Sequence, residues 1–214
     1  MADIDSITQA TRDSLGRVAI DLQERFRGTF GLETVRDLVF DSYIELAVTA
    51  TVDRWLIVGA ERFADQRLRA LIHADDHSAT RVPGVLFLCV HNSGRSQMAL
   101  GWFAHLAGDR AVAWSGGSEP EGEINGAAVA TMAEVDIDIS RQFPKPWAME
   151  FFSAADVVVT MGCGDSCPLV PGKHYEDWEI DDPAGKSVEE IRPIRDEIKQ
   201  RVIKLMDQLE ISHA

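Results

Sequence analysis

The stretch that most constrains this chain is a short apolar run that leads through a polar loop into a helical pattern. Residues 85–90 read Val-Leu-Phe-Leu-Cys-Val, which is typical of a buried strand. A loop of Asn, Ser and Gly follows, and beyond Arg95 the apolar residues recur at helical spacing, at Met98, Trp102, Phe103 and Leu106. A strand that passes through a tight loop into a helix predicts an α/β fold.

Strands and helices keep alternating after this first unit. Three more strands are predicted, at residues 111–116, 156–161 and 174–180. The later helices are expected at residues 122–135, 146–154 and 187–209. This order predicts an open, four-stranded parallel sheet flanked by helices over residues 85–214, with 156–161 as a central strand. Because ligands bind beyond the carboxyl ends of such strands, the loops after the first, third and fourth strands should converge on one site.

Residues 1–78 follow a different pattern, in which apolar positions predict three helices at about residues 4–26, 32–50 and 52–73. Such segments form a small all-α helical bundle, and the polar stretch at residues 79–84, which ends in Pro-Gly, is expected to be a linker. We interpret the bundle as a scaffold or association module, and its apolar faces suggest a homodimer. For His73 and His77, four residues apart, solvated histidines at a polar helix end are favoured over a metal-binding pair.

Composition argues against several classes of function. The net charge of −14, from 21 basic and 35 acidic residues, argues against nucleic acid as a partner. The sequence shows neither a secretory signal pattern nor an apolar segment of membrane-spanning length, so we expect a cytoplasmic protein with no membrane partner. Its three cysteines all follow residue 88, and an odd number without a secretory signal favours catalytic, redox or metal-binding roles over structural disulfides.

The loop after the first strand is a candidate oxyanion site with a nucleophile at its base. Backbone N–H groups in a tight loop and at a helix start favour negative charge, which predicts an oxyanion-binding loop formed by Val90, His91, Asn92, Ser93, Gly94 and Arg95. The same field should stabilise a thiolate at Cys89, and Arg95 adds a charged fork that matches two oxyanion oxygens. Ser96 could hold the thiolate and steady it as a leaving group. The alternative, an inert strand cysteine, is disfavoured by the Cys-x5-Arg-Ser spacing.

Two more thiols, Cys163 and Cys167, lie in a loop interrupted by glycines. They could form a relay by thiol–disulfide exchange, in which Cys163 attacks Cys89 and Cys167 then attacks Cys163. A second reading is a zinc ion held by these two cysteines and His174, with or without Cys89, although Cys-x3-Cys without a second pair is a poor structural zinc pattern. A pair of inert cysteines is the third reading.

The turn after the fourth strand, Asp181-Asp182-Pro183, supplies a candidate general acid. A carboxylic acid there could protonate a leaving oxygen while the thiolate attacks. We choose Asp182 over Asp181, partly because Pro183 fixes the backbone beyond it and partly because of the resemblance described next. The alternative is that this turn caps the N-terminus of a helix.

The loop from Cys89 to Ser96, with Gln97-Met98-Ala99 and the later Asp182-Pro183, resembles the low-molecular-weight protein tyrosine phosphatase family. More closely, the chain is similar to the arsenate reductases built on that fold, of the thioredoxin-coupled type with three working cysteines. The stretches that carry this likeness are 95–99, 101–102, 134–140, 156–160 and 178–185. The resemblance covers residues 84–211, and some actinobacterial-type reductases carry a similar helical extension associated with dimerisation.

The resemblance implies an arsenate reductase that serves arsenic detoxification. Cys89 would attack arsenate, Asp182 would protonate the departing oxygen, and Cys163 would attack the Cys89–arsenic adduct to release arsenite. Cys167 would then resolve the disulfide, and an external thioredoxin, or a mycoredoxin or low-molecular-weight thiol, would restore the thiols. No bound cofactor or metal is expected. The alternatives are a tyrosine phosphatase that hydrolyses phosphate esters, an activity also expected weakly in a reductase, and a thiol-based metal-binding protein. Ala184 stands where the phosphatases carry an aromatic residue, which favours a small inorganic oxyanion.

Overall fold

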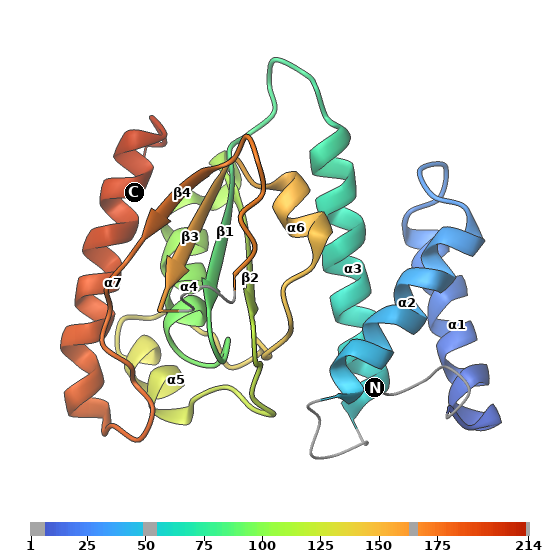
Figure 1. The fold of residues 1–214 in the computed structure, drawn as a ribbon, viewed down its shortest axis with the longest axis horizontal. Helices are drawn as coiled ribbons and strands as arrows, with labels where there is room; N and C mark the ends of the chain where they lie inside the picture. Colours follow the sequence, from blue (N-terminus) through green and yellow to red (C-terminus); the bar gives the residue numbers. More distant parts are fainter. Residues whose placement is uncertain (1–6, 49–54, 163–166, 213–214) are drawn as a thin grey trace. The chain divides into compact units, whose positions relative to one another are not determined.

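The computed structural model describes residues 7–48, 55–162 and 167–212. The chain divides into two compact units, residues 1–72 and 73–214, whose elements are labelled in Figure 1. The first unit is helical and the second contains a sheet with helices around it, as the sequence predicts.

The N-terminal unit is built from three helices: α1 (Gln9–Arg25), α2 (Leu32–Ala47) and α3 (Leu56–Asp75), the last of which runs on into the second unit. Its α1 begins where the Thr8 side chain accepts a hydrogen bond from the backbone N–H of Thr11, so this helix starts later than expected. The predicted apolar faces meet in one core, whose buried members are Leu15, Ala19, Leu22, Phe26, Val35, Leu38, Val39, Phe40, Ala60, Ala64 and Leu68. The small all-α bundle is therefore confirmed.

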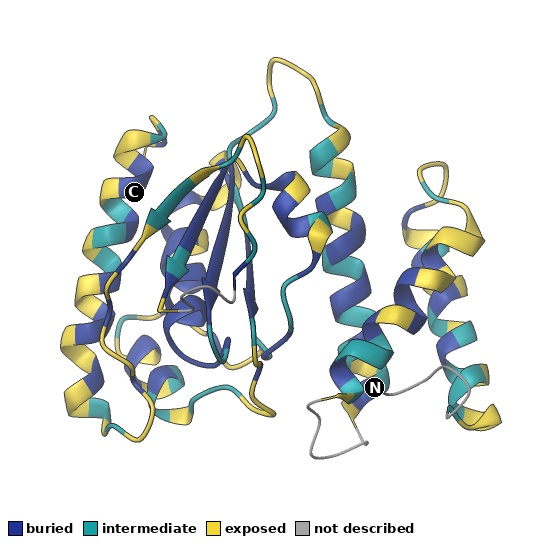
Figure 2. Ribbon diagram, viewed as in Figure 1, coloured by how far each residue is buried: buried dark blue, intermediate teal, exposed yellow. Residues whose placement is uncertain are grey.

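The second unit contains the predicted four-stranded parallel sheet. Its strands are β1 (Gly84–Cys89), β2 (Val112–Gly117), β3 (Val157–Met161) and β4 (His174–Asp177), in the spatial order β2-β1-β3-β4. The two central strands, β1 and β3, are almost wholly buried, as the dark ribbons in Figure 2 show. In the register, Cys89 lies beside Gly117 and Met161, so three strands end level at the same edge of the sheet.

Helices cover both faces of this sheet. The main core gathers the residues of β1 and β3 that face α4 (Arg95–Ala107), α5 (Gly126–Ala133) and α7 (Val188–Gln208). On the other face, α6 (Met149–Ala154) packs against β1. A short 3-10 turn, η3 (Gly108–Arg110), joins α4 to β2. The nucleophile candidate, Cys89, points to the α4 side because it belongs to this main core.

Several element boundaries differ from the sequence prediction, each for a local reason. The helix expected from residue 122 begins at Gly126, because the Asn125 side chain accepts the backbone N–H of Ala128 at 2.9 Å. The helix expected from residue 146 begins at Met149, because Pro146 is still extended and bridges to Gly117. The fourth strand, expected to reach residue 180, ends at Asp177.

The expectation that His73 is solvated is wrong. Its ring lies 5.4 Å from the ring of Trp114, between centroids, and its Nε2 atom is buried. Burial lowers the pKa of His73 from its ordinary value, and the nearby Arg81 guanidinium lowers it further. His77 is exposed. Within the described residues no group of three His, Cys, Asp or Glu side chains could hold a metal ion.

Candidate active site

The oxyanion-binding loop, residues 90–95, joins the end of β1 to the start of α4. The carbonyl groups of residues 90–94 point outward, away from the interior of this loop. The segment that follows β2 takes three of them: the N–H groups of Glu119, Glu121 and Asn125 donate to the carbonyls of residues 90, 91 and 93, at 2.9, 3.0 and 3.0 Å. The carbonyl of residue 92 accepts from Gln97 Nε2 at 2.8 Å, and that of residue 94 from the N–H of Met98 at 2.9 Å.

This arrangement of carbonyls determines where the amide groups of the loop point. In a trans peptide, the C=O of one residue and the N–H of the next lie on opposite sides of the chain. With the carbonyls of residues 90–94 bonded to groups outside the loop, the N–H groups of residues 91–95 face its interior. A set of convergent N–H groups at a helix N-terminus is an anion-binding site.

The thiol of Cys89 lies at the base of this loop and makes two polar contacts, to Asn92 and Ser96, which are themselves hydrogen-bonded to each other. Its side chain is buried, and its Sγ accepts the backbone N–H of Asn92 at 3.2 Å. Ser96 Oγ lies 3.0 Å from the same sulfur and accepts a hydrogen bond from Asn92 Nδ2 at 2.8 Å. Asn92 makes both contacts from the left-handed region, at φ 47°. An inert cysteine in an apolar strand would lack these donors.

The guanidinium of Arg95 lies against the other two loops that were predicted to meet here, the loop after β3 and the loop after β4. Its Nη2 donates to Asp182 Oδ2 at 2.7 Å, and its Nη1 donates to the carbonyl of Ile180 at 3.4 Å. A Cβ atom added to Gly162 would lie only 2.9 Å from Arg95 Nη1, so the start of the cysteine loop passes directly beside this charge. Arg95 is buried, whereas Asp182 is exposed.

Asp182 does not cap a helix. Its Oδ1 accepts the backbone N–H of Ala184 at 3.0 Å, which closes a local turn. The helix α7 is capped by Ser187 instead, in a capping box with Glu190. The alternative reading of the Asp-Asp-Pro turn is therefore wrong, and the carboxylate is placed at the site.

Two close approaches hold the loops together. A Cβ atom on Gly94 would lie 2.5 Å from Pro183 Cγ, so the oxyanion-binding loop touches the Asp182 turn at a point where no side chain fits. A Cβ atom on Gly117 would lie 2.5 Å from the carbonyl oxygen of Val90. Both glycines are needed for contact rather than for backbone freedom.

Gln97, which was not among the predicted site residues, supports the loop from behind. Its Nε2 donates to the carbonyl of Asn92 at 2.8 Å, to Asn92 Oδ1 at 3.0 Å and to the carbonyl of Phe143 at 3.1 Å. Gln97 is fully buried. Its place in the first turn of the predicted helix, next to the loop, is the sequence signal that could have indicated this role.

The two cysteines that the structure describes differ in oxidation state. Cys89 is a free thiol, whereas Cys167 is disulfide-bonded and buried. Cys163 lies outside the described residues. The chain after Cys167 is tied to β4 by the hydroxyl of Tyr175, which donates to the carbonyl of Pro168 at 2.9 Å and accepts the N–H of Val170 at 2.8 Å.

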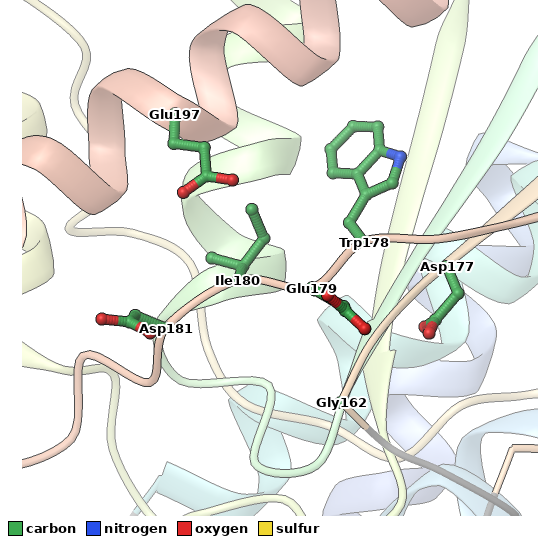
Figure 3. Close-up of a pocket in the computed structure, with 7 residues that line it drawn as sticks. All are labelled: Gly162, Asp177, Trp178, Glu179, Ile180, Asp181 and Glu197. Carbon is green, nitrogen blue, oxygen red and sulfur yellow. The ribbon is translucent and has the colours of Figure 1, made fainter.

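A pocket of about 420 Å³ lies beside the site and is shown in Figure 3. Carboxylate side chains dominate its lining, which consists of Gly162, Asp177, Trp178, Glu179, Ile180, Asp181 and Glu197. Like charges repel an oxyanion at close range, so this pocket does not suit an anionic substrate. The loop is therefore the candidate anion site.

Comparison with known proteins assigns the class. Residues 84–213 match the low molecular weight phosphotyrosine protein phosphatase family, and residues 15–72 match the protein-tyrosine-phosphatase-like, N-terminal domain. The chain belongs to the low molecular weight phosphotyrosine protein phosphatase family.

Within that family the chain is similar to arsenate reductases, as its motifs predict. A solved structure of the thioredoxin-dependent arsenate reductase of Corynebacterium glutamicum is 41% identical, with a TM-score of 0.81 over 92% of this chain and 97% of that one. Arsenate reductase 2 of Staphylococcus saprophyticus is 40% identical over 127 residues, which are 58% of this chain and 95% of the relative. A solved arsenate reductase in a phosphate-binding state is 35% identical, with a TM-score of 0.53 over 60% of this chain and 99% of that one.

No helix among the described residues is both long and apolar enough to cross a membrane.

Proposed function

We propose that this chain is an arsenate reductase that reduces arsenate to arsenite by a three-cysteine relay, in the service of arsenic detoxification. The observation that carries the proposal is the loop whose N–H groups converge over the Cys89 thiol, with the Arg95 guanidinium beside it. Arsenate is a tetrahedral oxyanion that such a loop would bind, and the relatives with both units or with the second unit alone are arsenate reductases by name.

The first step is a displacement at arsenic. The Cys89 thiolate attacks the arsenic atom, an As–O bond breaks, and Asp182 gives its proton to the departing oxygen, which leaves as water. Arg95 holds two arsenate oxygens. The arsenate oxygens compete with Asp182 for this guanidinium, so substrate binding releases the carboxyl group toward the departing oxygen. Ser96 donates to the sulfur and steadies it when it later leaves.

The second step reduces arsenic. The Cys163 thiolate attacks the sulfur of Cys89, the S–As electron pair stays on arsenic, and arsenite leaves while a Cys89–Cys163 disulfide forms. Cys167 then attacks Cys163, which frees Cys89 and leaves a Cys163–Cys167 disulfide. Support comes from the states of the described cysteines, because a free Cys89 and a disulfide-bonded Cys167 are what the end of this sequence requires.

A reductant has to return two electrons to the final disulfide in each cycle. We propose a thioredoxin-like protein, as in the name of the Corynebacterium glutamicum relative, with a mycoredoxin or a low-molecular-weight thiol as the alternative donor. Cytoplasmic thiol systems supply these donors, which is why we propose a cytoplasmic location.

The decisive experiment compares two activities in one variant. In Cys163→Ser, multiple-turnover arsenate reduction with a purified thioredoxin system should fall to background, because the arsenic adduct has no thiol to attack it. Hydrolysis of an aryl phosphate should continue, because it needs only the loop, Cys89 and Asp182. If arsenate turnover continues in Cys163→Ser, the relay is wrong.

A weak phosphatase activity is the second candidate, favoured by the family and by the complete loop, nucleophile and acid. The acid turn carries Ala184 where phosphatases of this family have an aromatic residue, so aryl phosphates should be poor substrates. If the wild type hydrolyses aryl phosphates efficiently and turns over no arsenate with any thiol donor, the chain is a phosphatase.

A further inference from the structure

A turn of apolar residues follows Cys167, and the proposed chemistry does not use it. It consists of Pro168, Leu169, Val170 and Pro171, none of which is buried. Leu169 is 82% exposed, more than any other large apolar side chain among the described residues. A run of apolar residues in contact with water is unfavourable and often marks an interaction site, so this turn needs an explanation.

The turn is held in a fixed shape by a side chain of β4. The hydroxyl of Tyr175 donates to the carbonyl of Pro168 at 2.9 Å and accepts the N–H of Val170 at 2.8 Å. One hydroxyl therefore ties the main chain on both sides of Leu169, whose own side chain is left in water. A side chain that the fold has already positioned loses less conformational entropy on binding, which favours contact with a partner.

The turn begins at the cysteine whose disulfide has to be reduced in each cycle. Cys167 is disulfide-bonded and only 7% exposed. A buried sulfur offers a reductant almost no surface of its own, so a donor that attacks this disulfide has to be held by the surface around it. Leu169 is part of that surface, because its Cα atom lies at most about 7 Å from that of Cys167.

Exposed carboxylates lie at the other end of the cysteine loop. Gly162, where this loop begins, lines the pocket of Figure 3 together with Asp177 and Glu179, whose side chains are both exposed. The Cα atoms of Gly162 and Cys167 are at most roughly 19 Å apart, because consecutive Cα atoms are 3.8 Å apart. A protein contact of ordinary size, about 800 Å² on each partner, covers both ends of the loop.

We infer that residues 168–171 form the docking turn for a protein dithiol reductant, with Leu169 as the anchor. The partner is a protein whose reactive cysteine lies beside an apolar groove, which takes the Leu169 side chain, and beside a basic group, which faces Asp177 and Glu179. This surface favours a protein donor over a low-molecular-weight thiol. The inference deepens the proposed function, on which it rests in taking the disulfide of Cys167 as the one that the donor reduces.

The chemistry at this surface is two thiol–disulfide exchanges. A thiolate of the donor attacks the disulfide of Cys167, whose S–S bond breaks as a mixed disulfide forms. The second thiol of the donor then attacks the mixed disulfide and frees this chain. Two electrons and two protons pass to the cysteines of this chain, and the donor leaves as a disulfide.

The test follows the reduction of oxidised protein and uses no arsenate. The probes are purified reduced thioredoxin and dithiothreitol, and the free thiols are measured by alkylation and mass spectrometry. In Leu169→Ser, the second-order rate constant with thioredoxin should fall about ten-fold, by the loss of one anchor side chain. The rate with dithiothreitol should stay within about two-fold of the wild type, because a small dithiol needs no docking surface.

Three further variants separate docking from damage to the disulfide. Leu169→Met keeps an apolar side chain of similar volume and should retain the wild-type rate with thioredoxin. Tyr175→Phe releases the turn and should lower that rate by a smaller factor, about three-fold, without changing the rate with dithiothreitol. Ile72→Ser is the control, because it removes an apolar side chain that is 40% exposed on α3, outside the turn, and should change neither rate.

Salt tests the basic group of the partner. The rate constant with thioredoxin should fall as ionic strength rises, and it should fall less steeply in Glu179→Gln, which removes one of the two carboxylates. The same salt dependence in both proteins overturns the part of the inference that concerns Asp177 and Glu179.

Three outcomes overturn the docking turn. In the first, thioredoxin reduces Leu169→Ser at the wild-type rate. In the second, this variant loses equally with thioredoxin and with dithiothreitol, which would make the turn a support of the disulfide. In the third, thioredoxin reduces the wild type no faster than dithiothreitol does. A chain that turns over no arsenate but passes these measurements refutes the proposed function and keeps the docking turn.

Discussion

At the scale of single residues, Asp182 has two roles: it pairs with Arg95 in the free protein, and we propose that it protonates the departing oxygen of the substrate. Its carboxylate pairs with the guanidinium at 2.7 Å while its other oxygen closes the turn at Ala184. Because water screens the exposed carboxylate of Asp182, this pair contributes little to stability, at most about 1 kcal/mol, although Arg95 is buried. Its importance is therefore in the chemistry, where a proton must reach the departing oxygen.

We expect Asp182→Asn to lower the rate of arsenate reduction by about two orders of magnitude, because positioned acids contribute roughly 10²–10⁴-fold. The variant should remain folded with an unchanged Tm. Asp181→Asn is the control, because the Asp181 carboxylate is exposed and pairs with Lys186 Nζ, at 3.8 Å, rather than with Arg95. Steady-state kinetics with a thioredoxin system measures both variants, and equal rates in Asp182→Asn and Asp181→Asn would exclude Asp182 as the acid.

Residue types and spacing predicted the loop and the Asp182 turn, because strong local patterns carry that chemistry. They could not predict which residues support the site from a distance in sequence. Lys145, whose N–H donates to Asn92 Oδ1, reaches the loop only after the chain has folded, and a lysine between two prolines has no local feature that indicates burial. The pairing of Arg95 with Asp182 likewise joins positions 87 residues apart.

At the scale of elements, Glu134 joins the end of α5 to α7. Its carboxylate accepts three hydrogen bonds from Arg192, at 2.8, 2.9 and 3.3 Å, and one from Arg195 at 3.3 Å. The hydrogen bond from Arg192 is the main reason that the pKa of Glu134 lies below its ordinary value. Arg195 also donates to the carbonyl of Thr131, so the two arginines hold the last turn of α5.

The pair of Glu134 and Arg192 predicts that the stability of the fold depends on pH in the acidic range. A carboxyl group whose pKa is lower in the folded state stabilises the fold above its unfolded pKa, and the contribution is lost as pH falls through the folded pKa. The wild type should therefore have a higher Tm than Glu134→Gln near neutral pH, and the difference should shrink as pH falls below the ordinary pKa of a glutamate and vanish once the folded protein is protonated at Glu134. Glu189→Gln, which removes an 84% exposed carboxylate 4.0 Å from Arg192, should show little change. A constant difference across this pH range would contradict the assignment.

Element types were predictable from apolar periodicity, and element ends were not. The parallel sheet with helices on both faces follows from the alternation of buried strands and helices, because few other topologies cover both faces of such a sheet. The ends depend on single contacts, such as the Asn125 side chain that starts α5 and the bridge at Pro146 that delays α6. The bridge between Pro146 and Gly117 joins segments that are far apart in sequence, which a local pattern cannot show, and the start of α5 depends on one side chain rather than on apolar periodicity.

At the scale of the whole molecule, the second unit holds every described group of the proposed first step. The staphylococcal relative matches only 58% of this chain and yet 95% of its own length, so it has little that corresponds to the N-terminal unit. We expect a shortened chain of residues 73–214 to fold and to reduce arsenate with a kcat within about three-fold of the full chain, since domains with their own core fold alone. A folded but inactive shortened chain, judged by circular dichroism and turnover, would show that the helical unit takes part in catalysis.

We propose that the helical unit serves association rather than chemistry, by forming a homodimer. Its outer surface carries exposed apolar side chains, among them Ile20, Leu32 and Val48. Light scattering of the full and shortened chains measures this directly, because only the full chain should have twice its monomer mass. A monomeric full chain would contradict the proposal.

The contact between Gly94 and Pro183 has a consequence for how the family can diverge. A side chain at residue 94 would overlap the proline ring unless one of the two loops shifted, so each position constrains the other. A homologue with a larger residue in place of Gly94 must have a smaller one in place of Pro183, or a shifted acid turn. The two loops should therefore evolve as a pair, and their covariation would mark which lineages keep this geometry.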